Sequence, residues 1–223
     1  MYGIEVTAPS PAWAESILIE GQSTIDAEIQ RVDAEISEFV RRKELLLAKR
    51  TASRQPLRLL FDIGTGLEDI VLSVFEELGA IVRRPDSPGM EDGWITVHVG
   101  EDVFQGVLEV KGTRSRQFKE DGLRQLGTWI NRGIELEQRR YKGLFVGNAD
   151  IGTRPERRKS PFSAGFASHA ELHSFAAITS TDLFRVLQEN RAGALDRETF
   201  WRELFETDGV YIHQPHRAAF ETE

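Results

Sequence analysis

Glu109 and Lys111 are the most informative pair of residues in the chain, because both are charged and both lie in a hydrophobic strand. They belong to the segment Val-Leu-Glu-Val-Lys-Gly at positions 107–112. Side chains two residues apart on a strand project from the same face of the sheet, so a carboxylate and an ammonium group should lie side by side. Burying such groups is costly unless they are paired or bind a metal. The pair therefore indicates a functional site.

Two further carboxylates precede this strand. Asp92 stands at the start of the preceding strand, and Glu68 lies near the beginning of an amphipathic helix over residues 67–78. Taken alone, each has an ordinary explanation, since Asp is common in turns and Glu is favoured at helix N-termini. If Asp92 and Glu109 lie at neighbouring strand ends, they could instead bind a hard divalent cation such as Mg²⁺. Lys111 would then hold a water or offset charge on phosphorus, which suits metal-assisted phosphodiester hydrolysis.

This order of residues resembles the PD-(D/E)XK nuclease superfamily, and most closely its Mrr-like restriction endonuclease group. The shared pattern is a helix with a Gly-x-x-Leu-Glu start, then an Asp, then Glu-x-Lys on the following strand, within residues 60–190. The resemblance implies a nuclease that uses Mg²⁺ or Mn²⁺ on nucleic acid, with DNA the favoured substrate. Asp92, Glu109 and the Val110 carbonyl would bind the metal. Lys111 would activate water, and Glu68 would be an outer or second-metal ligand.

The chain departs from the family pattern in two places. The next helix of the family carries Gln-x-x-x-Tyr, and here Gln125 is followed by Trp129, which keeps an aromatic ring but moves its polar group. Gln125 would orient a neighbouring side chain or the substrate. The family's Pro before Asp92 is absent, and the adjacent Glu91 is a possible substitute for that Asp.

Basic residues follow the Glu-x-Lys motif and could contact a phosphate backbone. The candidates for binding nucleic acid are Arg114, Arg116, Lys119 and Arg124, together with Trp129. A second basic group, with Arg158 in it, lies in a polar loop over residues 151–163. The alternative is a solvated surface of mixed charge. The net charge of −8 argues against a nonspecific nucleic-acid binder, but it does not exclude a locally basic groove.

The elements that must position these residues alternate between strands and helices after three consecutive strands. Such an order predicts an α/β protein with a restriction-endonuclease-like mixed β-sheet flanked by helices on both faces. Strands are expected at 80–83, 94–99, 103–111, 143–147, 174–178 and 210–212, and helices at 67–78, 120–137, 166–172, 181–189 and 196–205.

The N-terminal part differs in composition and predicts a coiled-coil helix between about residues 14 and 49. Apolar positions spaced alternately by four and three residues form a seam in which only Lys43 is polar: Ile25, Ile29, Val32, Ile36, Phe39 and Leu46 are the others. Residues 23–47 would then join copies of the chain or bind a partner protein. The alternative is a long helix packed on its own domain. A polar joint at 51–58 separates the two predicted domains, 1–55 and 56–223, the second with a C-terminal helical extension.

Composition sets outer limits on function. The 223 residues include no Cys, which excludes disulfides, thiolate metal sites and a Cys nucleophile. No secretory signal or membrane span is evident, so a soluble cytoplasmic protein without membrane partners is expected. Two further functional hypotheses remain open: a catalytically inactive nuclease fold that dimerises and docks onto a larger complex, and an effector nuclease of restriction or anti-phage defence.

Overall fold

The computed structural model describes residues 11–17, 19–84 and 92–214, and the chain divides into two compact units, residues 1–53 and 54–223. The first contains a short 3₁₀ helix, η1 (Ala12–Ser16), and the long helix α1 (Gln22–Arg54), none of whose residues is buried. The helix predicted to end near residue 49 continues to Arg54, and η2 (Gln55–Leu57), which contains Pro56, follows it. The division after Ser53 falls within the polar joint predicted at 51–58. No described helix combines the length and apolar character needed to cross a membrane.

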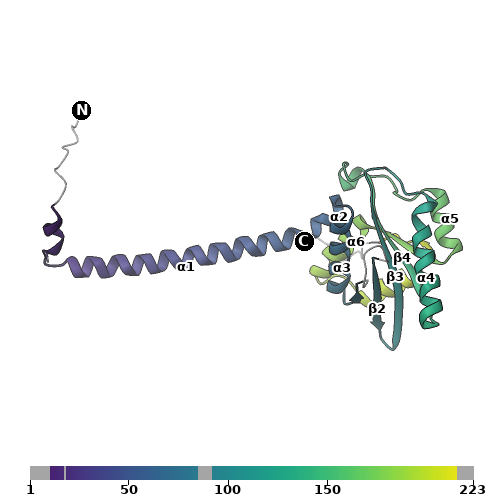
Figure 1. The fold of residues 1–223 in the computed structure, drawn as a ribbon, viewed down its shortest axis with the longest axis horizontal. Helices are drawn as coiled ribbons and strands as arrows, with labels where there is room; N and C mark the ends of the chain where they lie inside the picture. The colour runs from purple at the N-terminus through teal and green to yellow at the C-terminus, as the bar shows by residue number, and fades with distance from the viewer. Residues whose placement is uncertain (1–10, 18, 85–91, 215–223) are drawn as a thin grey trace, which may run out of the picture. The chain divides into compact units, whose positions relative to one another are not determined.

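A six-stranded mixed sheet forms the centre of the second unit, as the sequence predicts (Figure 1). Its strands lie in chain order: β1 (Ile81–Arg83), β2 (Gly93–Val99), β3 (Asp102–Gly112), β4 (Lys142–Asn148), β5 (Phe175–Thr179) and β6 (Gly209–Val210). The first three strands are antiparallel, since a tight turn joins β2 to β3. Helical crossovers make β3 to β6 parallel.

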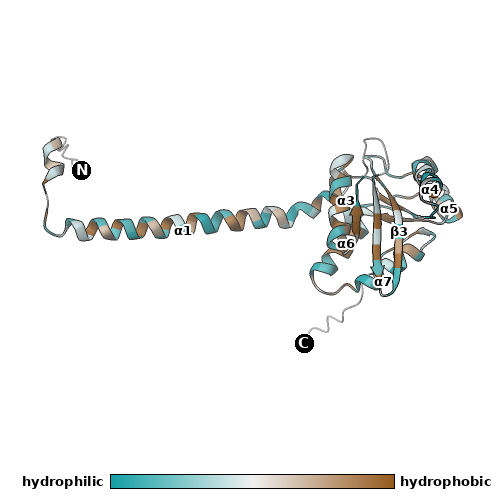
Figure 2. Ribbon diagram, turned by 60° about the horizontal axis from the view of Figure 1, so that its bottom comes forward, coloured by the Kyte–Doolittle hydropathy of each residue, from teal (hydrophilic) through white to brown (hydrophobic). Residues whose placement is uncertain are grey.

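Helices cover both faces of this sheet. One face packs against α2 (Arg58–Phe61), α3 (Thr65–Glu77), α6 (Ser180–Arg191) and α7 (Arg197–Glu206). The other packs against α5 (Ala164–Leu172) and α4 (Arg124–Glu137), which follows η3 (Glu120–Leu123). Hydrophobic residues concentrate in the strands between these layers (Figure 2). A short 3₁₀ helix, η4 (Pro155–Arg157), lies in the loop after β4.

The local sequence explains these elements. In α3 the apolar positions recur with the helical period, and Leu67, Ile70, Val71, Val74 and Phe75 are all buried. β4 is buried along its length after Lys142, as expected for a central parallel strand. The sheet therefore presents the carboxyl ends of β3, β4 and β5 at one edge, which is where open α/β sheets place their ligands.

Candidate active site

The carboxyl end of β3 carries Glu109 and Lys111, and their side chains meet as the sequence predicts. Glu109 is 2% exposed, and its carboxylate forms an ion pair with the Lys111 ammonium group. The Lys111 side chain remains 39% exposed, so the pair extends from the core toward solvent. β2 begins at Gly93, opposite Leu108, so β3 continues past it toward the site. Glu109 and Lys111 therefore lie at the carboxyl end of β3, where β2 no longer covers it.

Asp92 lies at this same edge. Its backbone N–H donates to the Leu108 carbonyl at 3.1 Å, and its Oδ2 accepts a 2.6 Å hydrogen bond from the Val110 N–H. The N–H and C=O of one strand residue face the same side, so the Val110 carbonyl also points toward the edge that Asp92 occupies. The structure thus brings Asp92 and Val110 next to Glu109, which is the neighbour relation that the sequence requires of a metal site.

Glu68 completes a group of three carboxylates and one ammonium. Gly64, with φ of 57°, leads the chain into α3 and places Glu68 in its first turn. Burial raises the pKa of Glu68, and the Asp92 carboxylate raises it further, while Lys111 lowers it. Burial likewise raises the pKa of Glu109, with Asp92 and Glu68 adding to the effect and Lys111 opposing it. The four side chains therefore interact electrostatically, and a bound cation would relieve the repulsion among the carboxylates.

Gln125 and Trp129 lie on α4, outside this group. Gln125 is exposed in the first turn of α4 and, within the described residues, forms no hydrogen bond with Glu68, Asp92, Glu109 or Lys111. Trp129 is partly buried against the core under α4 and α5. Its indole N–H is buried and has no hydrogen-bond partner among the described residues. The contacts of the structure do not join either residue to the four charged side chains, and their roles stay predictions.

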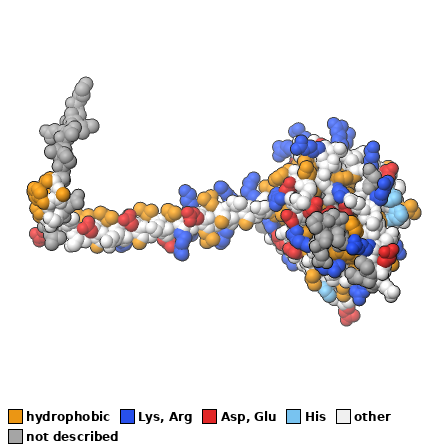
Figure 3. Space-filling view, viewed as in Figure 1, with side chains coloured by type: hydrophobic (Ala, Val, Ile, Leu, Met, Phe, Trp, Pro, Cys, Tyr) orange, Lys and Arg blue, Asp and Glu red, His pale blue; other side chains and the backbone are white. Residues whose placement is uncertain are grey.

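The basic residues predicted to bind nucleic acid lie between β3 and the first residue of α4. Arg114, Arg116, Lys119 and Arg124 are all exposed, and none forms an ion pair within the described part of the chain. Lys and Arg side chains gather at the upper end of the globular unit in Figure 3, beyond the end of β3. Their cationic groups are therefore available to an incoming polyanion.

Two residues that the sequence did not assign to the site hold α2 and α3 in place. Asn148, at the end of β4, is 1% exposed, and its Nδ2 donates to the Asp62 carbonyl at 2.9 Å. Its Oδ1 accepts a 3.0 Å bond from Arg158, which also donates to the Leu60 carbonyl. Together they tie the segment before α3 to the sheet. An Asn directly after a buried strand was the available signal.

The oxygen donors at the end of β3 fit a hard divalent cation. Among the described residues no group of three or more His, Asp and Glu side chains is arranged to hold a metal ion alone. Mg²⁺ does not need such a cage, since it usually binds one or two carboxylates together with water and phosphate oxygens. Asp92, Glu109 and the Val110 carbonyl supply a set of that size. Glu91, the possible substitute for Asp92, lies outside the described residues.

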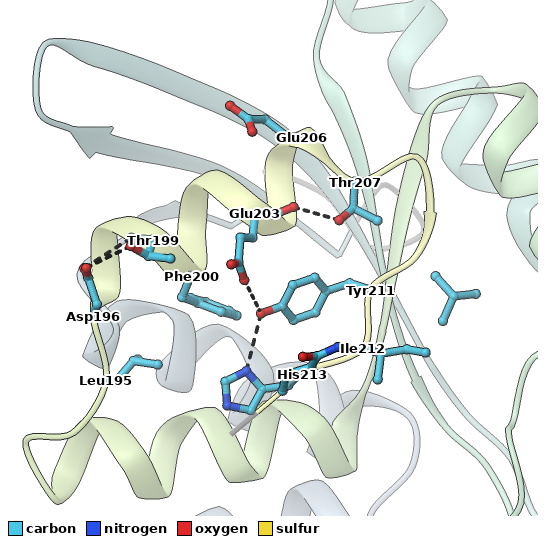
Figure 4. A pocket seen from close by; sticks show the side chains of 12 residues that line it. Leu195, Asp196, Thr199, Phe200, Glu203, Glu206, Thr207, Tyr211, Ile212 and His213 are labelled. Carbon is cyan, nitrogen blue, oxygen red and sulfur yellow. Dashed lines mark hydrogen bonds between the residues drawn. The ribbon is translucent and has the colours of Figure 1, made fainter. Parts of the chain in front are cut away.

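A larger cavity, of about 630 Å³, lies beside α7 and β6 and is a poor site for nucleic acid. Acidic side chains line it, among them Glu203 and Glu206, and its described lining includes no Lys or Arg. Figure 4 shows the Tyr211 hydroxyl donating to Glu203 at 3.2 Å and lying 3.3 Å from Nδ1 of His213. Such a lining repels a phosphate backbone, so the edge at β3 is the better candidate.

Comparison with known proteins places the fold but not the activity. Neither a protein-family model nor a curated protein matches the sequence. The structure of the restriction endonuclease FokI bound to DNA aligns with a TM-score of 0.50 at 12% identity, over 70% of this chain and 30% of that chain. A second FokI structure aligns with a TM-score of 0.49 at the same identity and coverage. The chain thus spans about 30% of the length of that enzyme, and its own fold is restriction-endonuclease-like.

Proposed function

We propose that the chain is a Mg²⁺-dependent nuclease of the PD-(D/E)XK superfamily, similar to its Mrr-like group, that hydrolyses phosphodiester bonds in nucleic acid. One observation carries the proposal: Glu68, Asp92, Glu109 and Lys111 come from three separate elements and interact at the open end of β3. Holding mutually repelling carboxylates at a buried site lowers the stability of the fold. Ionisable groups whose pKa values are shifted in this way cluster at functional sites.

In this proposal Asp92, Glu109 and the Val110 carbonyl hold Mg²⁺ or Mn²⁺. The bound ion would acidify a water and stabilise negative charge on the phosphate. Lys111, whose ammonium group leaves the core beside Glu109, orients the attacking water. The water oxygen would bond to phosphorus while the bond to the leaving oxygen breaks. The attacking water would release one proton to solvent, and the leaving oxygen would take one from solvent. Glu68 would serve as an outer or second-metal ligand.

DNA is the proposed substrate, held by the basic residues that follow β3. Arg114, Arg116, Lys119 and Arg124 are exposed without ion pairs in the described residues, so they can contact phosphates without first breaking a salt bridge. Trp129 and Gln125 would act from α4 on the substrate or on a neighbouring side chain. The resemblance to restriction endonucleases further suggests an effector of restriction or anti-phage defence, whose cleavage is switched on by a partner or by oligomerisation.

A second candidate function is an inactive nuclease fold used for assembly. The exposed apolar residues of α1 favour it, since Ile25 is 63% and Phe39 66% exposed. The charged group at β3 opposes it, because an inactive site has no need for three interacting carboxylates.

The deciding experiment incubates the purified full-length protein with double-stranded DNA, single-stranded DNA and RNA, in Mg²⁺, Mn²⁺ or EDTA. We expect cleavage that requires a divalent metal and falls by at least about 100-fold in Lys111→Ala and in Asp92→Ala. Lys49→Ala, which removes the same charge from α1, is the matched control and should cleave as the wild type does. Circular dichroism would show that the variants are folded. A wild-type protein inert on every substrate, with or without partners, would contradict the proposal.

A further inference from the structure

A small cavity opens at the carboxyl ends of β4 and β5, apart from the charged group at β3. Its volume is about 170 Å³, and Gly147, Thr179, Ser180 and Arg158 are among the residues that line it. This is smaller than the roughly 300–1,000 Å³ of sites that enclose whole small molecules. It suits a group the size of a phosphate better than a complete nucleotide.

Ser180 lines this cavity and carries an unsatisfied hydroxyl. It is the first residue of α6 and is 1% exposed, yet its Oγ has no hydrogen-bond partner among the described residues. Its neighbours are satisfied: the Thr179 hydroxyl accepts from the Asp182 N–H and donates to the Asp182 carboxylate, both at 2.9 Å. Buried hydroxyls are nearly always hydrogen-bonded, so the Ser180 hydroxyl is a donor that is not used within the described fold.

The charge around the cavity favours an anion. Arg158, Lys159 and Arg185 line it, and Asp182 is the one carboxylate among the described lining residues. Asp182 pairs with Arg185 at 2.8 Å. Arg158 donates its hydrogen bonds to three neutral acceptors, and within the described residues neither it nor Lys159 forms an ion pair. Asp150 and Glu156 still interact with Arg158 electrostatically from outside the lining.

The start of α6 adds to this attraction. The first N–H groups of a helix have no partner inside the helix, and the helix dipole favours negative charge there. Thr179 caps the helix by accepting a hydrogen bond from the Asp182 N–H, and Ser180 and Thr181 stand in its first turn beside the cavity. Ser180, the first turn of α6 and the basic residues Arg158, Lys159 and Arg185 therefore border one small cavity, a combination typical of phosphate sites at helix N-termini.

We propose that this cavity binds a phosphate of the nucleic-acid strand at a position other than the one that is cleaved. The inference rests on the proposed nuclease function, and the sheet register connects the two sites. Gly147 lines the cavity and pairs with Lys111 on the adjacent strand, and neighbouring strands lie only about 4.8 Å apart. One nucleic-acid strand can then place one phosphate at β3 and another at Ser180, which fixes how the strand runs across the site.

The test measures phosphate binding without cleavage. Titrating inorganic phosphate into the full-length protein should shift the amide NMR signals of Ser180 and Thr181. In EDTA, Ser180→Ala should bind a short DNA duplex about tenfold more weakly, because a hydrogen bond to a charged group is lost. Its melting temperature should not fall, since the hydroxyl has no partner within the fold. Ser73→Ala, an exposed serine on α3, is the matched control and should change neither quantity.

Lys159→Ala gives a second, independent readout. The slope of log affinity against log salt concentration is negative, and loss of one phosphate contact should reduce its magnitude by about 0.9. Lys49→Ala on α1 should leave the slope unchanged. Unchanged duplex affinity in Ser180→Ala would overturn the inference, as would a lower melting temperature without any change in binding. Cleavage is measured in a separate assay. If the wild type cleaves nucleic acid and Ser180→Ala does not change duplex binding, the phosphate site is refuted and the nuclease function is not. Lack of cleavage with Ser180-dependent duplex binding refutes the nuclease function alone.

Discussion

At the scale of single residues, Glu109 is a buried carboxylate whose pKa is raised chiefly by burial. A carboxyl that binds its proton more tightly in the folded than in the unfolded protein lowers the free energy of unfolding as the pH rises through and above its ordinary pKa. At neutral pH its ionised form therefore costs stability, and below both pKa values the cost disappears. We predict that Glu109→Gln stabilises the metal-free protein near pH 7, and that the gain shrinks as the pH falls toward 4.5 and is absent below it.

Thermal unfolding in EDTA across pH 4 to 8 would measure this difference. Glu171→Gln, an exposed carboxylate on α5, is the control and should follow the wild type at every pH. A gain that stayed constant with pH would mean that Glu109 acts through packing and not through its charge. Glu109→Gln should also lose metal-dependent cleavage. The negative charge of Glu109 is needed to bind the metal, although the same charge lowers the stability of the fold.

At the scale of elements, Asn148 and Arg158 bind the end of β4 to α2 and so hold α3, with Glu68, against the sheet. Asn148→Ala leaves the Asp62 carbonyl and an Arg158 N–H without their partner in a buried setting. We predict a loss of about 1–3 kcal/mol in the free energy of unfolding, or roughly 2–4 °C in melting temperature per kcal/mol.

Asn190→Ala is the matched control for this change. Asn190 also accepts a hydrogen bond from an arginine, Arg197, at 2.6 Å, but at an exposed position, so water can replace the lost partner. Its effect should stay within about 0.5 kcal/mol. Equal losses in the two variants would show that the bonds of Asn148 do not stabilise the connection between β4 and α2.

The contrast between predicted and unpredicted elements has a physical basis. Periodicity and turn residues were enough for the sheet and helices, because burial of α3 or β4 depends on each element's own pattern. The long helix extends past its predicted end near residue 49 to Arg54, because polar residues are compatible with an exposed helix and only Pro56 marks a break. The position of Asn148 at the end of a buried strand is visible in the sequence, but its partner is not, because Asp62 lies 86 residues away. Ser180 stayed unnoticed because only the folded chain shows that its hydroxyl lacks a partner.

At the scale of the whole molecule, the exposed seam of α1 is the feature that a monomer does not explain. Ile29 is 52% and Ile36 53% exposed, on a helix without buried residues. Such a helix is expected to bury its apolar positions against a second copy. We predict that the wild type sediments as an oligomer whose mass depends on concentration, and that the double variant Ile29→Glu, Ile36→Glu sediments as a monomer.

The control for this prediction adds the same two charges outside the seam, at Gln30→Glu and Ser37→Glu, and should keep the wild-type mass. The thermal transition of the globular unit should survive in both double variants, since α1 contributes nothing to its core. A wild type that is monomeric at every concentration would contradict self-association. If the protein is a nuclease, each copy hydrolyses one phosphodiester at a time, so an oligomer can cut both strands of a duplex in one encounter. The seam variant should then convert supercoiled DNA mainly to the nicked form, and the control variant should yield linear DNA as the wild type does.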